Sequence, residues 1–199
     1  GHGPCVLVGG EPGIGKTRLV EELVAPLSRG RVLWGRCRES QGAPAYWPWR
    51  QALRAYAAGR ARHALQAELA GAAADVARLV PEIGAVLPDV PPPPALEGEQ
   101  ARFHLFDAVT GFLHRTSARE PLVVVLDDLH WADSESLLLL RFLCDAPGEA
   151  PLLVVGTYRE VVMRQAACVP PILADLARLG RRLSLGGLSE LEVAGFVRD

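Results

Sequence analysis

The sequence predicts an α/β fold in which a mainly parallel β-sheet lies between layers of helices. Short apolar runs rich in β-branched residues alternate along the chain with segments whose apolar residues recur at helical spacing. Strands that alternate with helices in this way form parallel sheets covered on both faces. The run at 122–126 contains no polar residue, which is typical of a parallel strand buried on both faces.

The first half of the chain supplies two expected strands and a helix-rich stretch. The first strand, at 5–8, is apolar and bounded by proline and glycine. A helix is expected from Lys16, because the next apolar residues fall at helical spacing; they are Leu19, Val20, Leu23, Val24 and Leu27. The second strand is expected at 31–37. The α-rich stretch from 47 to about 79 contains three helix breakers; they are Gly59, Gly71 and Pro81.

The second half continues the alternation of helices and strands. The expected helices span about 99–116, 134–144 and 172–179, and the expected strands span 122–126, 152–155 and 183–185. Asp133 is a good N-cap for the helix that begins at 134. Four consecutive prolines at 91–94 exclude a helix or a central strand there.

We expect the chain to be a piece of a larger protein. It opens almost directly on a strand, and it ends soon after Ser189 and Glu192, which form a capping box that starts a further helix. The prediction is one α/β domain over 1–186 with a helical insertion at about 47–95, followed by the truncated start of a helical segment at 187–199.

The composition excludes several classes of protein. With 49% apolar residues and a net charge of −2, the chain of 199 residues is not intrinsically disordered. No window approaches 18 uncharged apolar residues, so no membrane span is expected, and the absence of a signal peptide predicts a cytoplasmic protein. The charge balance argues against direct nucleic-acid binding by this segment. The cysteines and histidines show no metal-ligand spacing, and the four cysteines are expected to be reduced.

A phosphate-binding loop lies between the first strand and the first helix. Residues 10–17 match G-x-x-x-x-G-K-[ST], whose glycines let backbone N–H groups surround an anion at the helix N-terminus. Lys16, the only lysine of the chain, supplies a mobile charge for the β- and γ-phosphates, and Thr17 offers a hydroxyl to Mg²⁺. The candidate nucleotide-binding residues are Gly10, Glu11, Pro12, Gly13, Ile14, Gly15, Lys16, Thr17 and Arg18. The alternative is a glycine-rich turn with a surface lysine.

Acidic and basic partners follow two later strands. Asp127 directly follows the strand at 122–126 and is the candidate for the Mg²⁺ shell. Asp128 stands where many ATPases carry a glutamate that polarises the attacking water, and its side chain is roughly 1.5 Å shorter. Slow hydrolysis is therefore expected. Arg159, after the strand at 152–155, could contact the γ-phosphate and is the third catalytic candidate beside Lys16 and Asp128. The alternatives are ordinary turn residues for the aspartates and a solvated arginine.

Two aromatic motifs remain outside this site. The segment 46–49 holds two of the four tryptophans, and we expect it to pack the helical insertion onto the sheet, with a contact to adenine or to a neighbouring domain as the alternative. His130 and Trp131 are expected to serve packing and capping.

Five segments together resemble one known family; they read GEPGIGKTRL, WGRC with GAPAYWPW, ARFHLFDAV, LVVVLDDLHWAD and LLVVGTYR. They are similar to the ATPase domain, often called AAA-16-like, of STAND-type bacterial transcriptional regulators, which include large LuxR-family regulators and antibiotic regulatory proteins of actinomycetes. The resemblance covers about residues 4–192. It implies a three-layer αβα P-loop NTPase fold of the additional-strand type, with five strands, the strand at 152 lying between those at 5 and 122.

The resemblance also implies a function and partners. In such proteins ADP holds a closed monomer, and ATP favours an open, oligomerising form that lets a separate DNA-binding domain act. Lys16 and Thr17 would be the Walker A pair, Asp127 and Asp128 the Walker B pair, and Arg159 the sensor arginine. The implied cofactors are ATP or ADP and Mg²⁺. The implied partners are other domains of the same regulator, among them a DNA-binding domain, a winged helix and helical repeats.

The leading interpretation is an ATP/ADP switch that is a weak ATPase. One alternative is a P-loop kinase or an AAA-type motor, in which turnover is the purpose. Another is a module that binds nucleotide, or only a partner protein, without turnover.

Overall fold

The β-sheet organises the molecule. A computed structural model describes residues 4–39, 43–92, 95–146, 148–161 and 171–188. Its strands are β1 (Cys5–Gly10), β2 (Arg31–Arg36), β3 (Leu122–Asp127), β4 (Leu152–Arg159) and β5 (Arg181–Leu185). Their order is β2-β3-β4-β1-β5, and each neighbouring pair is parallel. The predicted α/β fold and the predicted place of β4 between β1 and β3 are confirmed, and all carboxyl ends of the strands lie at one edge of the sheet.

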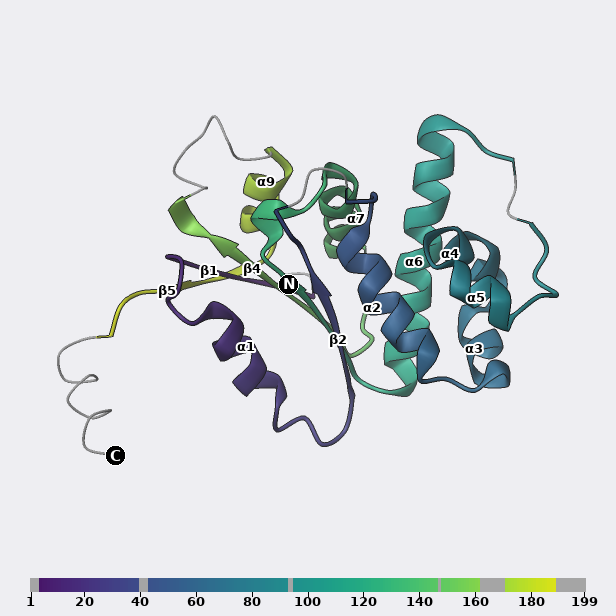
Figure 1. Cartoon of the computed structure of the whole chain (residues 1–199), viewed down its shortest axis with the longest axis horizontal. Helices are drawn as coiled ribbons and strands as arrows, with labels where there is room; N and C mark the ends of the chain where they lie inside the picture. The colour runs from purple at the N-terminus through teal and green to yellow at the C-terminus, as the bar shows by residue number, and fades with distance from the viewer. Residues whose placement is uncertain (1–3, 40–42, 93–94, 147, 162–170, 189–199) are drawn as a thin grey trace.

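Helices cover both faces of this sheet (Figure 1). Helix α1 (Lys16–Val24) lies on one face, and the other face carries α2 (Trp47–Ala58), α6 (Gly98–Arg119), α7 (Ser134–Asp145) and α9 (Pro171–Leu179). Successive side chains of a strand point to opposite faces. Val124 of β3 therefore belongs to the large core beneath α2, α6 and α7, whereas Val125 belongs to the smaller cluster beneath α1.

The helices between residues 62 and 86 lie beyond α2 and α6 from the sheet (Figure 1). They are α3 (Arg62–Leu69), the short 3₁₀ helix η1 (Ala70–Ala72), α4 (Ala73–Leu79) and α5 (Pro81–Val86). The three predicted breaks are confirmed: Gly59 caps α2, Gly71 lies in η1, and Pro81 is the first residue of α5. A proline is tolerated there because the first N–H of a helix has no partner within the helix.

The aromatic segment joins this region to the sheet. Trp49 is fully buried, and its indole N–H donates a hydrogen bond to the Ser136 carbonyl at 3.0 Å, which links α2 to α7. The start of α2 lies so close to β2 that a Cβ on Gly35 would stand 2.1 Å from the Pro48 carbonyl oxygen. The predicted packing role of the segment is confirmed for Trp49.

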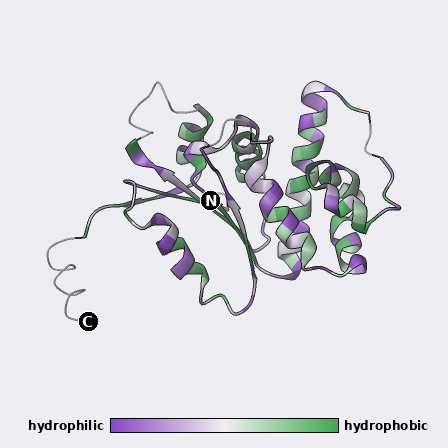
Figure 2. Ribbon diagram, in the orientation of Figure 1, coloured by the Kyte–Doolittle hydropathy of each residue, from purple (hydrophilic) through white to green (hydrophobic). Residues whose placement is uncertain are grey.

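Helix α1 is shorter and less buried than its apolar spacing indicates. It ends at Val24, so Leu27 lies outside it. Val20 is buried against the sheet, whereas Leu19 and Leu23 are 40% and 55% exposed. In Figure 2 hydrophilic and hydrophobic residues are mixed along this helix. The reason is that, among the helices that the structure describes, only α1 lies on this face, so only one side of it is covered by the sheet.

Several boundaries differ from the expectation. Strand β4 continues to Arg159 instead of ending at 155, β1 continues to Gly10, and β5 begins at Arg181. The longer strands matter because they carry the candidate residues at their last positions. The predicted helix from Ser189, like Cys168, lies outside the described residues. None of the described helices is long and apolar enough to cross a bilayer.

Candidate functional site

The glycine-rich loop joins the end of β1 to the start of α1. Gly13 has φ 78° and Gly15, the N-cap of α1, has φ 100°. L-residues rarely adopt this left-handed region, and a Cβ at either position would meet no atom of the described residues within 4 Å. The backbone conformation, and not crowding, therefore requires these two glycines. The loop thus leads directly into the N-terminal N–H groups of α1, which have no partner within the helix.

Lys16 lies inside this loop. Its side chain turns back and donates hydrogen bonds to the carbonyl oxygens of Gly10, at 3.1 Å, and Glu11, at 2.9 Å. Burial lowers the pKa of Lys16, and the nearby carboxylates of Asp128 and Asp127 act in the opposite direction. A phosphate oxygen is a stronger acceptor for an ammonium group than a carbonyl. The ammonium is therefore placed to exchange a loop carbonyl for an entering phosphate.

Thr17 and Asp127 meet next to Lys16. The Thr17 hydroxyl lies 3.1 and 3.2 Å from the two carboxylate oxygens of Asp127, to which it donates. Asp127 is buried at the last position of β3. A hydroxyl and a carboxylate are hard oxygen ligands of the kind that Mg²⁺ accepts when it keeps several waters. These two residues therefore fit the predicted Mg²⁺ site.

Thr157 is a residue that sequence reasoning missed. Its hydroxyl is fully buried and donates a hydrogen bond to Asp127 Oδ1 at 2.6 Å. The Thr157 hydroxyl oxygen also accepts a hydrogen bond from the backbone N–H of Asp128 at 2.9 Å. Thr157 thus fixes the Asp127 carboxylate and the start of the turn after β3. The sequence contains one signal for this residue. Thr157 stands two residues before Arg159, and in an extended strand such residues lie on the same face.

Asp128 begins the turn that follows β3. Its backbone is left-handed, with φ 61° and ψ 47°, and its side chain is 39% exposed. Burial, and next the charge of Asp127, raise the pKa of the Asp128 carboxyl, while Arg159 and Lys16 act against this rise. A half-exposed carboxylate at this position can receive a proton from a water molecule.

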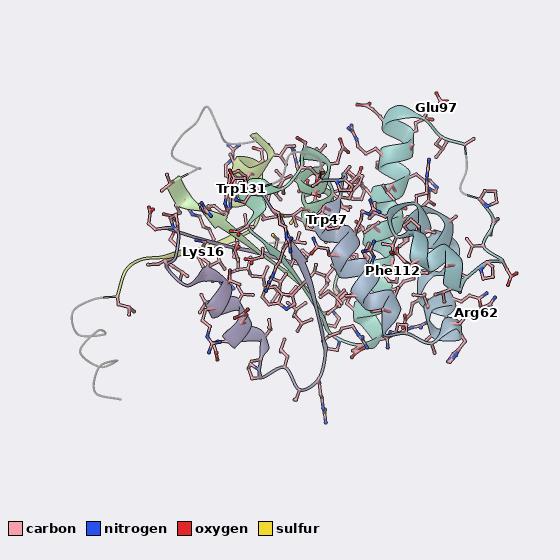
Figure 3. All side chains as sticks on the ribbon, in the orientation of Figure 1. Lys16, Trp47, Arg62, Glu97, Phe112 and Trp131 are labelled. Carbon is pink, nitrogen blue, oxygen red and sulfur yellow. The ribbon has the colours of Figure 1, made fainter. Side chains whose placement is uncertain are left out.

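The short 3₁₀ helix η2 (Leu129–Trp131) completes this edge of the sheet. The His130 ring is buried and lies 5.1 Å, centroid to centroid, from the Trp131 ring. Arg159 is the last residue of β4, and its guanidinium carbon lies 6.0 Å from the centroid of the Trp131 ring. Figure 3 shows Lys16 at the start of α1 and Trp131 in η2, whereas Phe112 lies among the helices of the other half. The packing prediction for His130 and Trp131 fits these ring contacts.

The outer residues of the motif contribute less through their side chains. Glu11 and Pro12 are exposed in the loop, and Ile14 is half-buried. The Arg18 guanidinium pairs with Glu22 of α1 at 2.5 Å. Its backbone N–H, at the start of α1, is also available to a phosphate.

A comparison with protein families decides what kind of domain this is. The family described as the AAA ATPase domain matches residues 1–155. The chain belongs to this family. The residues that form the candidate site up to Asp128 lie inside the matched region, and Thr157 and Arg159 lie just beyond it. A comparison with curated proteins finds no match.

Solved structures resemble the AAA ATPase domain only distantly. One is the ORC2 protein of Aeropyrum pernix in ADPNP–ADP complexes, with 13% identity over 98% of this chain and 45% of that chain and a TM-score of 0.47. The cytoplasmic domain of the type VII secretion ATPase EccC of Thermomonospora curvata has 17% identity over 94% and 20%, with a TM-score of 0.39. PH0250 of Pyrococcus horikoshii OT3 has 12% identity over 96% and 90%, with a TM-score of 0.43. The chain spans less than half the length of the ORC2 protein.

Proposed function

We propose that this AAA ATPase domain is a slowly hydrolysing ATP/ADP switch within a larger bacterial transcriptional regulator. The observation that carries the proposal is the meeting of Lys16, Thr17 and Asp127 at the carboxyl edge of the sheet, with Asp128 beside them. This arrangement combines a cation for phosphates, oxygen ligands for a metal and a carboxylate for a water molecule.

Each residue has a distinct task in this proposal. The loop N–H groups and Lys16 bind the β- and γ-phosphates, and Thr17 and Asp127 hold Mg²⁺, which when bound neutralises charge on the phosphate oxygens. Water attacks the γ-phosphorus, the bond from this phosphorus to the β,γ-bridging oxygen breaks, and Asp128 takes a proton from the water. The products are ADP and inorganic phosphate. Arg159 contacts the γ-phosphate, so that ADP lacks one of the contacts made by ATP.

The nature of Asp128 favours a switch over a motor. Its carboxylate reaches roughly 1.5 Å less far than that of a glutamate. A general base that is too distant from its water lowers the rate without weakening the binding of phosphates. A long-lived ATP state suits a protein whose two conformations carry a signal.

The proposed partners follow from the resemblance of the sequence to the ATPase domain of STAND-type transcriptional regulators, and they belong to the same proposal. In the ATP state the domain would assemble with further copies, and it would act on a DNA-binding domain elsewhere in the same protein. A cytoplasmic location is part of the proposal.

Calorimetry and a steady-state ATPase assay on the 199-residue chain test this function. We expect Mg²⁺-dependent ATP binding and a turnover below about one per second. Asp128→Asn should bind ATP as the wild type does and hydrolyse it more slowly. Arg62→Ala is a matched control that removes an exposed, ion-paired cation on α3, outside the site, and it should change neither quantity.

Three results would contradict the proposal in different ways. Absence of ATP binding removes the function altogether. A turnover well above one per second favours a motor or a kinase. Tight binding with no turnover leaves a nucleotide-binding module without hydrolysis.

A further inference from the structure

His130 is a buried polar side chain that the proposed chemistry does not yet use. The side chain is 1% exposed, and within the described residues neither ring nitrogen has a hydrogen-bond partner. A buried polar group without a partner costs about 1–3 kcal/mol. An apolar ring could fill the same space without that cost. Packing against Trp131 therefore accounts for a ring at this position but not for its two nitrogens.

The Asp128 carboxylate, which lies close to this ring, points to an explanation for these nitrogens. His130 Nδ1 lies 3.8 Å from Asp128 Oδ1. This separation is too long for a hydrogen bond, but a movement of about 1 Å would close it. Hydrogen bonds in active sites are often long without substrate and tighten when it binds.

The surrounding backbone holds the two residues in this relation. The N–H of Trp131 donates to the Asp128 carbonyl at 2.9 Å, which closes the turn between them. The imidazole is packed beside the Trp131 ring. Its place is therefore fixed by η2, whereas the Asp128 side chain is partly exposed and can move toward it.

We propose that His130 is a positioning residue that donates a hydrogen bond to the Asp128 carboxylate when Mg²⁺ and ATP are bound, and so aims this carboxylate at the attacking water. The inference rests on the proposed function, because it requires Asp128 to accept the proton of that water. His130 itself gains and loses no proton in this step and does not touch the nucleotide.

The charges around the ring suit this role. Burial lowers the pKa of His130 to about 4, and the positive charges of Arg159 and Lys16 contribute to this change, with Asp127 acting against it. The imidazole is therefore neutral at pH 7. A neutral imidazole has one N–H donor, so it can orient the carboxylate without neutralising it. A cation in its place would lower the basicity of Asp128.

Three substitutions separate this role from packing. His130→Phe keeps a ring and removes both nitrogens. His130→Asn can place an amide nitrogen near the position of Nδ1, and His130→Gln reaches toward the position of Nε2 instead. We expect His130→Phe and His130→Gln to lower kcat by about 10- to 100-fold with the Kd for ATP nearly unchanged. His130→Asn should recover most of the lost rate.

A second measurement and a control make the test independent of folding effects. In an Asp128→Asn background, His130→Phe should cause no further loss of kcat, because the side chain that it positions is already disabled. His114 on α6 is a matched control, since both of its ring nitrogens are also buried without a partner among the described residues. It lies near Gly148, which precedes β4 and so belongs to the opposite edge of the sheet. His114→Phe should leave kcat unchanged.

The outcomes of these experiments distinguish a failure of the inference from a failure of the proposed function. The inference is overturned if His130→Phe turns over ATP at the wild-type rate, if His130→Asn is as slow as His130→Phe, or if kcat and ATP affinity fall together. Wild-type protein that binds ATP without hydrolysing it overturns the inference and leaves nucleotide binding intact. Wild-type protein that binds no ATP shows instead that the proposed function has failed.

Discussion

Replacing Thr157 with valine tests whether one buried hydroxyl holds the metal-binding carboxylate in place. Valine has nearly the shape of threonine and lacks the oxygen. The change therefore removes the 2.6 Å hydrogen bond to Asp127 and leaves the backbone N–H of Asp128 without its acceptor. Asp127 keeps its contact with Thr17.

The loss of stability can be estimated from these two bonds. A hydrogen bond to a charged acceptor contributes about 1.5–3 kcal/mol, and a buried N–H left without a partner costs about 1–3 kcal/mol. Because the side chain is fully buried, little water can replace either bond. Allowing for relaxation of the turn, we expect Thr157→Val to lower the free energy of unfolding by about 2–4 kcal/mol. Thr157→Ser keeps the oxygen and should lose only about 1 kcal/mol, the value of one methyl group.

Urea unfolding measures the stability, and a Mg²⁺ titration of ATP binding measures the site. Loss of a group that orients a metal ligand typically weakens metal binding by about 10- to 100-fold. We therefore expect the Mg²⁺ midpoint to rise in Thr157→Val and to stay near the wild-type value in Thr157→Ser. If the two variants unfold at the same urea concentration and share one Mg²⁺ midpoint, the hydroxyl does not hold Asp127 and this reasoning is wrong.

Three further changes test other parts of the site. Lys16→Ala should abolish tight ATP binding, because it removes the mobile cation held inside the loop, and calorimetry that finds wild-type affinity would contradict this. Arg159→Ala should reduce the preference for ATP over ADP measured by competition binding, and an equal loss for both nucleotides would remove the sensor role. Between pH 7.5 and 5 the unfolded chain protonates His130 and the folded one, with a pKa of about 4, does not. Stability should therefore fall by about 2 kcal/mol as the pH is lowered, and His130→Phe should lack this part of the decrease in urea unfolding.

The parts of the fold and of the site that could be predicted are those that short sequence patterns specify. The glycines, Lys16 and Thr17 form a contiguous motif, and Asp127 directly follows an unbroken apolar run. Such patterns fix the strand, the loop and the helix without knowledge of the rest of the chain. The end of β4 is harder to predict, because this strand continues through Thr157 and Arg159, where polar residues interrupt the apolar run. Pairing with the neighbouring strands extends β4 beyond its apolar part.

The hydrogen bond between Thr157 and Asp127 could not be predicted, because it depends on the register between β3 and β4. No local sequence pattern specifies this register. In the sheet each residue of β3 pairs with the residue of β4 that lies thirty positions later, from Leu122 with Leu152 to Leu126 with Gly156. One further step in the same register brings Asp127 beside Thr157. A shift of one residue would send the threonine side chain to the other face and leave Asp127 without this hydrogen bond. The site is therefore fixed by packing along the whole length of the two strands, and substitutions that disturb their register at the far edge should damage metal binding while leaving every residue of the site unchanged.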